Sequence, residues 1–512
     1  MRRTACAYRI DFFTDLSYGL PVDRRERQSS ENKYRNEPHL KRKYTNMLIS
    51  FSVSNFRSFG EEVTLDMVAS AKLPDHTDHL IKIDDTDKHV VRTALLYGPN
   101  AAGKSNLIKA MGYAQSLICT GSQSSFATPD PFRFDSKAAS KPSSFEFRFM
   151  VGSEIFTYGF DVSRRGIEAE WLCSLRGSKE KVIFERDAKG LTQVGDGPRS
   201  FFPDDKEMHR TLSVLSQLPI RPNQLFLSRA NSLPVESLGR TVRGIIEWLT
   251  EDLVILEADV RACDMLERLY SDELFKKFAQ SFLCNVDTGI CELAFHEQSR
   301  DCRDHEREVF QYHGDETYFP YSRFGCAGDT DERLDPSDPT KVITRQLMSL
   351  HRGSDGNIRF ALPFSEESDG TQQLLHYLPY LHPQQGRSRV VVIDELDRSL
   401  HPKLCWELVD FFSKSCPGVR RQMIVTTHEA HLLDQDLLRR DEYWMVEKDK
   451  TGQSRLTPLT DFNVRKDLNL RKGYLQGRFD ALPIIGDISS LVSWLGCTTE
   501  GAKEDAQKEP SA

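Results

Sequence analysis

The stretch GPNAAGKS at residues 98–105 decides the fold, because it fits the pattern G-x-x-x-x-G-K-[S/T]. The apolar run ALLY at residues 94–97 precedes it and has the character of a buried strand. Behind it, apolar residues recur at the spacing of one helix face, at Leu107, Met111, Ala114 and Ile118. The sequence therefore predicts a loop between a strand and a helix N-terminus. A glycine-rich connector without a ligand is the competing interpretation, which the flanking strand and helix disfavour.

A loop of this kind holds a polyphosphate with a ring of backbone N–H groups and the positive end of a helix dipole. We expect Lys104 to lie against the β- and γ-phosphates of ATP, and Ser105 to supply one ligand to Mg²⁺. ATP and Mg²⁺ are therefore the predicted cofactors. The predicted nucleotide-binding residues of this segment are Gly98, Asn100, Ala101, Ala102, Gly103, Lys104, Ser105 and Asn106.

The run VVVIDE at residues 390–395 predicts a second part of the same site. An unbroken β-branched run that ends in acids is typical of a central parallel strand whose C-terminal end faces a ligand. Asp394 is expected to hold Mg²⁺, and Glu395 to polarise the water that attacks the γ-phosphate. Two acids after a buried strand can also be a plain strand exit. The phosphate loop in the same chain favours the catalytic interpretation.

A third run, MIVTTH at residues 423–428, places His428 at the end of another apolar strand. We predict that His428 hydrogen-bonds the γ-phosphate and reports its presence; a surface or core histidine is the alternative. Asp397 follows the acid pair closely. It lies either in a loop that crosses to a neighbouring subunit or at the cap of a helix that begins near Pro402, and the sequence favours neither.

About 290 residues separate Ser105 from Asp394, so a large lobe is inserted between the two halves of the site. Shortly before the acid pair, Ser368 and Gly370 precede a run with helical spacing at Leu374, Leu375, Leu378 and Leu381. A serine and a glycine at a helix N-terminus can bind an anion. We interpret Ser368 and Gly370 as a divergent signature that clamps the γ-phosphate bound by a second protomer; an ordinary N-cap is the alternative.

Local patterns divide the chain into five predicted parts. Residues 1–46 form a disordered basic extension, with Met47 as an alternative start, and 47–200 form the N-terminal part of the head with a β-rich lobe. Residues 201–345 form an inserted helical and mixed lobe, 346–490 the C-terminal part of the head, and 491–512 a disordered tail. Alternation at residues 49–54 predicts a strand, and the polar text of 296–342 predicts a loop. Helical spacing through residues 205–285, for example at Ile245, Trp248, Leu249 and Leu253, predicts helices.

Composition sets wider limits. Because residues 1–46 carry 11 Lys/Arg against 6 Asp/Glu, the rest of the chain has a net charge of −13, although the whole chain has −8. This acidic balance disfavours a protein that coats nucleic acid without excluding a local basic patch. Eleven cysteines without a CxxC pair predict neither a zinc site of cysteines nor a disulfide framework, and favour a reducing cytoplasm. No apolar run reaches the length of a membrane span.

With these motifs in view, the chain resembles the RloA/AbiL-type ATPases of bacterial abortive-infection and anti-phage systems, which are related to the OLD and RecF/SMC groups. The resemblance spans most of residues 47–485, from ISFSVSNFRSFGEE through ESDGTQQLLHYLPYL to RKGYLQGRFDALP. It implies an α/β fold, an ABC/SMC-like P-loop ATPase head. By the same resemblance Arg57 in NFRSF contacts nucleotide, although an exposed arginine on a strand edge would look identical. The glutamine that contacts Mg²⁺ in ABC proteins has no match.

The resemblance further implies an ATP-dependent, head-to-tail homodimer or higher oligomer that regulates a separately encoded effector, usually a nuclease. Nucleic acid or a phage protein is the expected trigger. Two other functions stay open. In the first, the chain itself cuts nucleic acid in an OLD-like manner, with Glu447 and Asp449 in WMVEKDKTG as the acids. In the second, its heads clamp duplex DNA as in RecF/SMC-like repair ATPases.

Overall fold

The computed structural model describes residues 46–120, 128–190, 192–218, 220–234, 237–258, 265–286, 288–302, 329–335, 337–353, 359–382, 388–415, 419–462 and 469–479. The predicted basic extension, apart from Asn46, and the predicted tail 491–512 lie outside these residues. Within the described part of the chain, no helix combines the length and the apolar character needed to cross a membrane.

A six-stranded sheet forms the centre of the molecule and carries all three motif-bearing strands. Its order is β11 (Leu253–Leu256), β16 (Arg389–Ile393), β17 (Arg421–Thr426), β5 (Thr93–Tyr97), β18 (Tyr443–Lys448) and β19 (Ser454–Pro458). The first five strands are parallel, and β19 returns antiparallel to β18. The predicted α/β class is therefore confirmed, and β5 lies between two strands from the C-terminal part of the chain.

Both faces of this sheet are buried, which explains the unbroken apolar runs in its strands. On β16, Val390 and Val392 belong to one hydrophobic core, whereas Val391 and Ile393 belong to a second core on the other face. The first core lies against α2 (Lys104–Thr120) and the second against α10 (Asp369–Leu381) and α11 (Pro402–Lys414). The predicted apolar stripe of α2 is confirmed, because its four residues are buried.

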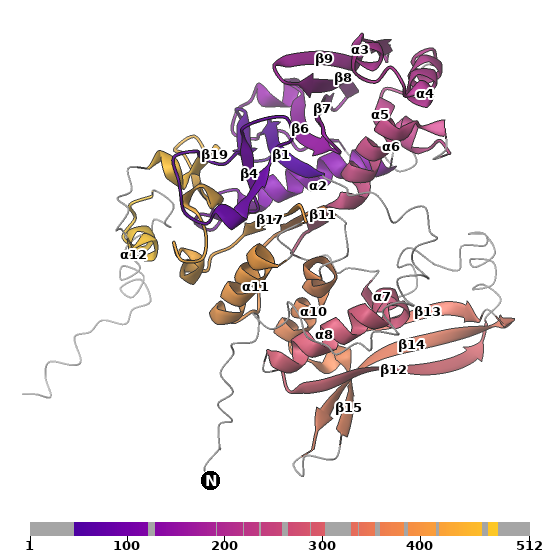
Figure 1. The fold of residues 1–512 in the computed structure, drawn as a ribbon, viewed down its shortest axis with the longest axis vertical. Helices are drawn as coiled ribbons and strands as arrows, with labels where there is room; N and C mark the ends of the chain where they lie inside the picture. Colours follow the sequence, from indigo (N-terminus) through magenta and orange to yellow (C-terminus); the bar gives the residue numbers. More distant parts are fainter. Residues whose placement is uncertain are drawn as a thin grey trace, which may run out of the picture.

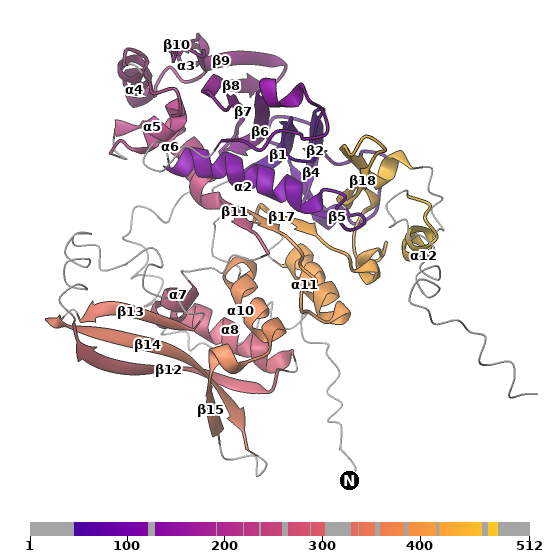
Figure 2. The same ribbon diagram turned by 180° about the vertical axis from the view of Figure 1, so that it is seen from behind.

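A seven-stranded antiparallel sheet covers α2 from the other side, and both views show the helix between the two sheets (Figures 1 and 2). The sheet order is β10 (Thr192–Val194), β9 (Lys179–Arg186), β8 (Gly166–Arg176), β7 (Glu154–Ser163), β6 (Ser143–Val151), β1 (Met47–Ser54) and β2 (Val63–Asp66). The predicted alternating strand is β1, in which Ile49, Phe51 and Val53 are buried and the serines between them are partly exposed.

Short helices connect this sheet back to the centre. They are α3 (Gly197–Phe201), α4 (Lys206–Ser216), α5 (Phe226–Asn231) and α6 (Arg240–Glu247), and α6 continues into a π-helical turn at Trp248–Asp252. The helical spacing predicted for residues 205–285 is wrong at Leu253, because Leu253 begins β11 and pairs with Val390 of β16. The run LVIL satisfies both the helical and the strand period, and the edge of β16 decides between them.

A second antiparallel sheet forms the inserted lobe, which lies on the other side of the central sheet from the seven-stranded sheet (Figures 1 and 2). It consists of β12 (Ile290–Asp301), β13 (Thr330–Asp335), β14 (Asp338–Arg352) and β15 (Arg359–Pro363), packed against α7 (Met265–Ser271) and α8 (Glu273–Asn285).

The loop predicted at residues 296–342 is therefore wrong where the structure describes it. The polar text forms strands because its charges pair across them. Arg345 is buried in β14 and forms ion pairs with Asp331 and Glu267, and Arg300 pairs with Glu332 at 3.0 Å. Pairs of opposite charge on facing strands add to the stability of a sheet, as apolar pairs do.

Two smaller pieces complete the described fold. Strands β3 (Leu80–Lys82) and β4 (His89–Val91) form an antiparallel pair that precedes β5, and a 3-10 turn at Thr77–His79 leads into β3. Helix α12 (Leu470–Leu475) packs beyond β18 and contributes Leu470 and Tyr474 to the second core.

Candidate functional site

The phosphate-loop segment ends β5 and begins α2, as predicted. Its backbone enters the left-handed region at Ala101 (φ 64°) and Gly103 (φ 114°), which curls the chain so that α2 starts at Lys104. The Lys104 ammonium donates to the carbonyl oxygens of Gly98 at 2.9 Å and Pro99 at 3.3 Å. Burial lowers the pKa of Lys104 to about 8, and nearby acids oppose that shift. A buried ammonium inside a ring of peptide groups suits a polyanion.

Two glycines of the loop have no room for a side chain. A Cβ on Gly98 would lie 2.2 Å from the carbonyl oxygen of Val446 in β18. A Cβ on Gly103 would lie 2.2 Å from Ser454 Oγ and 2.7 Å from Ser58 Oγ. Glycine is therefore required at both positions by packing, in addition to the positive φ at Gly103. The β18–β19 hairpin supports the loop from behind.

The remaining loop residues lie where the sequence places them. Ala102 is buried, and its carbonyl accepts a hydrogen bond from the Ser454 hydroxyl. Asn100 is exposed in the turn. Asn106, in the first turn of α2, donates from Nδ2 to Ser58 Oγ at 2.8 Å. Sequence reasoning missed the contacts of Ser58 and Ser454 with this segment: Ser58 lies in the turn after β1, within NFRSF, and Ser454 begins β19.

The acid pair meets the loop at the C-terminal edge of the central sheet. Ser105 Oγ donates to Asp394 Oδ1 at 3.0 Å, and Thr426 Oγ1 donates to the same oxygen at 2.6 Å. The backbone N–H of Glu395 in turn donates to Thr426 Oγ1 at 2.7 Å. Ser105 and Asp394 are thus held as a pair of oxygen ligands of the kind that Mg²⁺ prefers. Thr426 was missed, although a buried polar residue that ends an apolar strand beside Asp394 is a usable signal.

Glu395 has a left-handed backbone, with φ at 55°. This conformation costs energy for a residue with a side chain and is concentrated at functional sites. Its N–H bond to Thr426 holds the turn, while Asp394 N–H donates to the carbonyl of Leu256 in β11 at 2.9 Å. The strand that the sequence assigned to helix therefore helps to hold the acid pair.

His428 lies at the same edge of the sheet as Lys104 and the acid pair. Burial lowers the pKa of His428, the Lys104 charge lowers it further, and Asp397, Glu395 and Asp394 oppose both effects. A histidine with a lowered pKa is neutral near pH 7 and can hydrogen-bond a phosphate oxygen through its ring N–H.

The carboxylate of Asp397 accepts from the backbone N–H of His428, at 3.2 and 3.3 Å to its two oxygens. Helix α11 is capped by His401, whose Nδ1 accepts from the N–H of Lys403. The helix-cap alternative for Asp397 is therefore wrong. Asp397 instead ties the loop after β16 to the end of β17.

The signature candidates stand apart from the phosphate loop of the same chain. Ser368 is the N-cap of α10: its hydroxyl accepts from the N–H of Thr371 at 3.2 Å. A Cβ on Gly370 would lie 2.4 Å from the carbonyl oxygen of Ser399, whose own φ is 61°. In this chain Ser368 therefore has the ordinary capping contact, and Gly370 packs tightly against the loop that follows Asp397.

Arg57 occupies a tight turn between β1 and β2, with φ at 51° and its N–H donated to the carbonyl of Asp130 at 2.7 Å. Its guanidinium lies over the Phe56 ring, 5.6 Å from the centroid. Arg57 Nε is buried and has no hydrogen-bond partner in the described part of the chain. The next residue is Ser58, so the hydrogen bond from Asn106 links the Arg57 turn to α2.

The acids of the nuclease alternative do not form a cluster. Asp449 Oδ1 accepts from the N–H groups of Thr451 and Gln453 and caps the β18–β19 turn, and its other oxygen lies 3.4 Å from Arg455. Glu447 faces Arg455 across the same hairpin. These contacts account for both acids without a metal.

Comparison with known proteins identifies part of this arrangement. A family model described as "AAA domain, putative AbiEii toxin, Type IV TA system" matches residues 94–434, which is more than half of the chain. The match includes the phosphate loop, the acid pair and His428. No curated protein matches the chain.

Two of the solved structures that are similar to the chain are SMC heads. The SMC head domain from Thermotoga maritima is 14% identical, with a TM-score of 0.34, and the match covers 80% of this chain and 98% of that one. The SmcHead bound to the C-winged helix domain of ScpA is 12% identical, with a TM-score of 0.35, and the match covers 80% and 96%.

Proposed function

The chain belongs to the AAA_21 family of P-loop AAA domains, and from that premise we propose that it hydrolyses Mg·ATP between two copies of itself and so regulates a separately encoded effector. Family membership makes it a nucleotide-binding protein of the P-loop NTPase type. Hydrolysis, the magnesium ion, the dimer and the effector are the parts that we propose.

One observation carries the hydrolysis proposal. The chain of hydrogen bonds from Ser105 through Asp394 to Thr426 and the Glu395 N–H joins the phosphate loop to the acid pair. Ser105 and Asp394 hold Mg²⁺, which on binding neutralises charge on the phosphates. Lys104 binds the β- and γ-phosphates, Glu395 accepts the proton of the attacking water, and His428 donates a hydrogen bond to the γ-phosphate.

The dimer proposal rests on the N-terminus of α10. The N-terminus of α10 carries Ser368 and Gly370, and a helix N-terminus of this length attracts a phosphate. Gly370 packs against Ser399, in the loop that begins at Asp397. Asp397 in turn accepts from the N–H of His428. One loop therefore connects the N-terminus of α10 with the residue proposed to contact the γ-phosphate. Head-to-tail pairing places the α10 terminus of one protomer over the nucleotide of the other.

The role in bacterial anti-phage defence follows from the resemblance to RloA/AbiL-type ATPases, together with the family description, which names a toxin of a toxin–antitoxin system. We propose that ATP turnover in the dimer controls a nuclease encoded elsewhere. The turn-capping contacts of Asp449 support a separate effector over a nuclease within this chain.

The decisive experiment titrates the folded full-length protein with Mg·ATP in a calorimeter and measures phosphate release on the same sample. Saturable heat with turnover supports the proposal, and no heat from folded protein overturns it. For the defence role, the locus is expressed in a sensitive host and phage plating is compared between wild type and Lys104→Ala. Equal plating efficiency, with the wild type still protective, contradicts a role for nucleotide in defence.

A further inference from the structure

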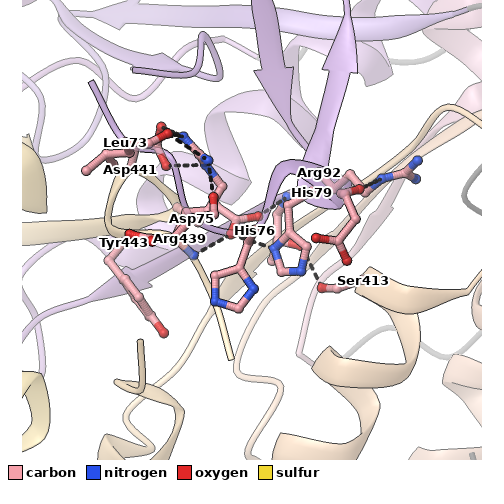
Figure 3. Close-up of polar contacts among 12 residues, drawn as sticks. Leu73, Asp75, His76, His79, Arg92, Ser413, Arg439, Asp441 and Tyr443 are labelled. Carbon is pink, nitrogen blue, oxygen red and sulfur yellow. Dashed lines mark hydrogen bonds and ion pairs between the residues drawn. The ribbon is translucent and has the colours of Figure 1, made fainter. Parts of the chain in front are cut away.

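A turn before β3 brings three metal-ligating side chains together, away from the nucleotide site. His76 is the N-cap of the 3-10 turn Thr77–His79, and its φ of 47° lies in the left-handed region. Side chains three residues apart eclipse each other in a 3-10 turn, so the sequence HTDH places His76 and His79 on one side. Their rings lie 4.9 Å apart between centroids. Figure 3 shows the two side chains next to each other.

The two rings are oriented by groups outside the turn. His79 Nδ1 lies 2.9 Å from a carboxylate oxygen of the buried Glu442, and His76 Nε2 lies 2.8 Å from the carbonyl oxygen of Gln435. A carboxylate or a backbone carbonyl on one ring nitrogen is the usual arrangement behind a metal-binding histidine, because it sets the tautomer and leaves the other nitrogen as the ligand. The free nitrogens are then Nδ1 of His76 and Nε2 of His79.

Glu442 is itself held in place. Its two carboxylate oxygens accept from the N–H of Thr93 at 3.2 Å and from the N–H of Arg439 at 2.8 Å. The oxygen that faces His79 therefore has a fixed position, which is what a supporting partner of a metal ligand requires.

We propose that His76, Asp78 and His79 bind one divalent transition metal, with zinc as the preferred ion. One ligand atom from each of the three lies within 4.8 Å of the others. Zinc bonds of about 2.1 Å in tetrahedral geometry need ligand atoms roughly 3.4 Å apart, so the cluster closes by about 1.4 Å at most. Asp78 is exposed and can rotate to supply that movement.

The ligand set distinguishes this site from the magnesium site. Two imidazoles and one carboxylate suit zinc and its neighbours in the first transition row, whereas Mg²⁺ and Ca²⁺ take oxygen ligands. Three protein ligands leave a fourth position for water or a small anion. His76 also lines a pocket of about 1070 Å³, in which the cations Lys403 and Arg471 face the acids Asp75, Asp434 and Asp436.

The turn that holds the three proposed ligands is bound to a distant part of the chain. Residues 70–79 already contact the segment 434–442 through Arg439, which donates to the carbonyls of Ser70, Leu73 and Asp75 and pairs with Asp441 at 2.9 Å (Figure 3). Gln435 and Glu442 also orient the two histidines, so the segment that follows the sensor candidate His428 supports the proposed metal site.

The test uses the full-length protein, stripped with a chelator and kept in excess Mg²⁺ so that oxygen-ligand sites are filled. It is titrated with Zn²⁺ in a calorimeter and with Co²⁺ in a spectrophotometer. The variants are His76→Asn, chosen because Asn tolerates the left-handed backbone, and the exposed Asp78→Asn. His431→Gln is the matched control, since His431 lines the same pocket outside the cluster.

We expect one Zn²⁺ per chain, visible Co²⁺ bands without a thiolate charge-transfer band, and a melting temperature that rises with Zn²⁺. His76→Asn and Asp78→Asn should each weaken binding by about ten-fold or more and lose the thermal shift, while His431→Gln keeps both. Weak, non-stoichiometric binding by the wild type overturns the proposal. A thiolate band also overturns it. So does binding by folded His76→Asn and Asp78→Asn that is as tight as that of the wild type.

Discussion

Ser105 Oγ lies 3.0 Å from Asp394 Oδ1, although 289 residues separate them in the chain. The contact exists because β5 and β16 run parallel and end at the same edge of the central sheet, with β17 between them. Side chains that follow the C-terminal ends of such strands meet in one crevice.

Glu395→Gln should retain Mg·ATP affinity and lower turnover by roughly 10²- to 10⁴-fold, because a general base contributes about that factor. Phosphate release gives the turnover and calorimetry gives the affinity. Light scattering should show ATP-dependent dimers that accumulate in this variant. Glu180→Gln, a change at an exposed acid on β9, serves as the control. Near-normal hydrolysis by Glu395→Gln would show that another group activates the water.

ATP affinity should depend on pH through Lys104. Burial lowers the pKa of its ammonium to about 8, so the group is charged below pH 8 and loses its proton above it. Bound phosphates favour the charged form, so binding takes up a proton and affinity falls roughly ten-fold between pH 7 and pH 9.

Lys104→Arg separates this effect from general changes with pH, since arginine stays charged across that range. Its dissociation constant, although weaker than that of the wild type, should be flat from pH 7 to pH 9. A flat profile for the wild type in the same calorimetric series would contradict the assignment to Lys104.

Thr426→Val should slow hydrolysis without unfolding the protein. The change keeps the side-chain shape but removes the hydroxyl that donates to Asp394 and accepts from the Glu395 N–H. A buried donor left without a partner costs about 1–3 kcal/mol, which is roughly 5- to 150-fold in kcat/KM. Thr426→Ser keeps the hydroxyl and should recover most of the rate. Equal rates for the two variants would mean that Thr426 only fills space.

Gly370→Ala should weaken ATP-dependent dimerisation. Its Cβ would lie 2.4 Å from the Ser399 carbonyl, so the N-terminus of α10 must move away from the loop that begins at Asp397. Overpacking of this kind costs about 1–3 kcal/mol. Ser368→Ala removes the cap alone, at about 1 kcal/mol. Both variants are made in the Glu395→Gln background and sedimented in the presence of ATP. The fraction of dimer should fall more for Gly370→Ala than for Ser368→Ala; an unchanged fraction of dimer would argue against a trans signature.

The elements that bind phosphate could be predicted because their chemistry is local. The strand of residues 94–97, helix α2 and the strand before Asp394 each carry a motif together with a matching period. The strand that begins at Leu253 was missed, because four apolar residues satisfy either period and only the free edge of β16 selects one. Local pattern cannot contain a pairing partner that lies 137 residues away.

Charged strands and supporting residues escaped prediction for a related reason. Residues 330–335 read as a loop by composition, and they form β13 because Asp331 meets Arg345 of β14 across the strands. Thr426, Ser58 and Ser454 act through single hydrogen bonds to residues of other elements. Such roles are set by contacts in space, so they become visible only in the folded chain.

The sandwiched position of β5 governs when the protein can become active during synthesis. The neighbours of β5 are β17 and β18, and the Ser454 hydroxyl that supports Ala102 comes 352 residues later. At roughly 5–20 residues per second, a ribosome needs about 20–70 s to reach Ser454 after it has made the loop. A nascent or truncated chain therefore carries the GPNAAGKS segment without the strands that shape it, and the loop gains its full support only after Ser454 has been synthesised.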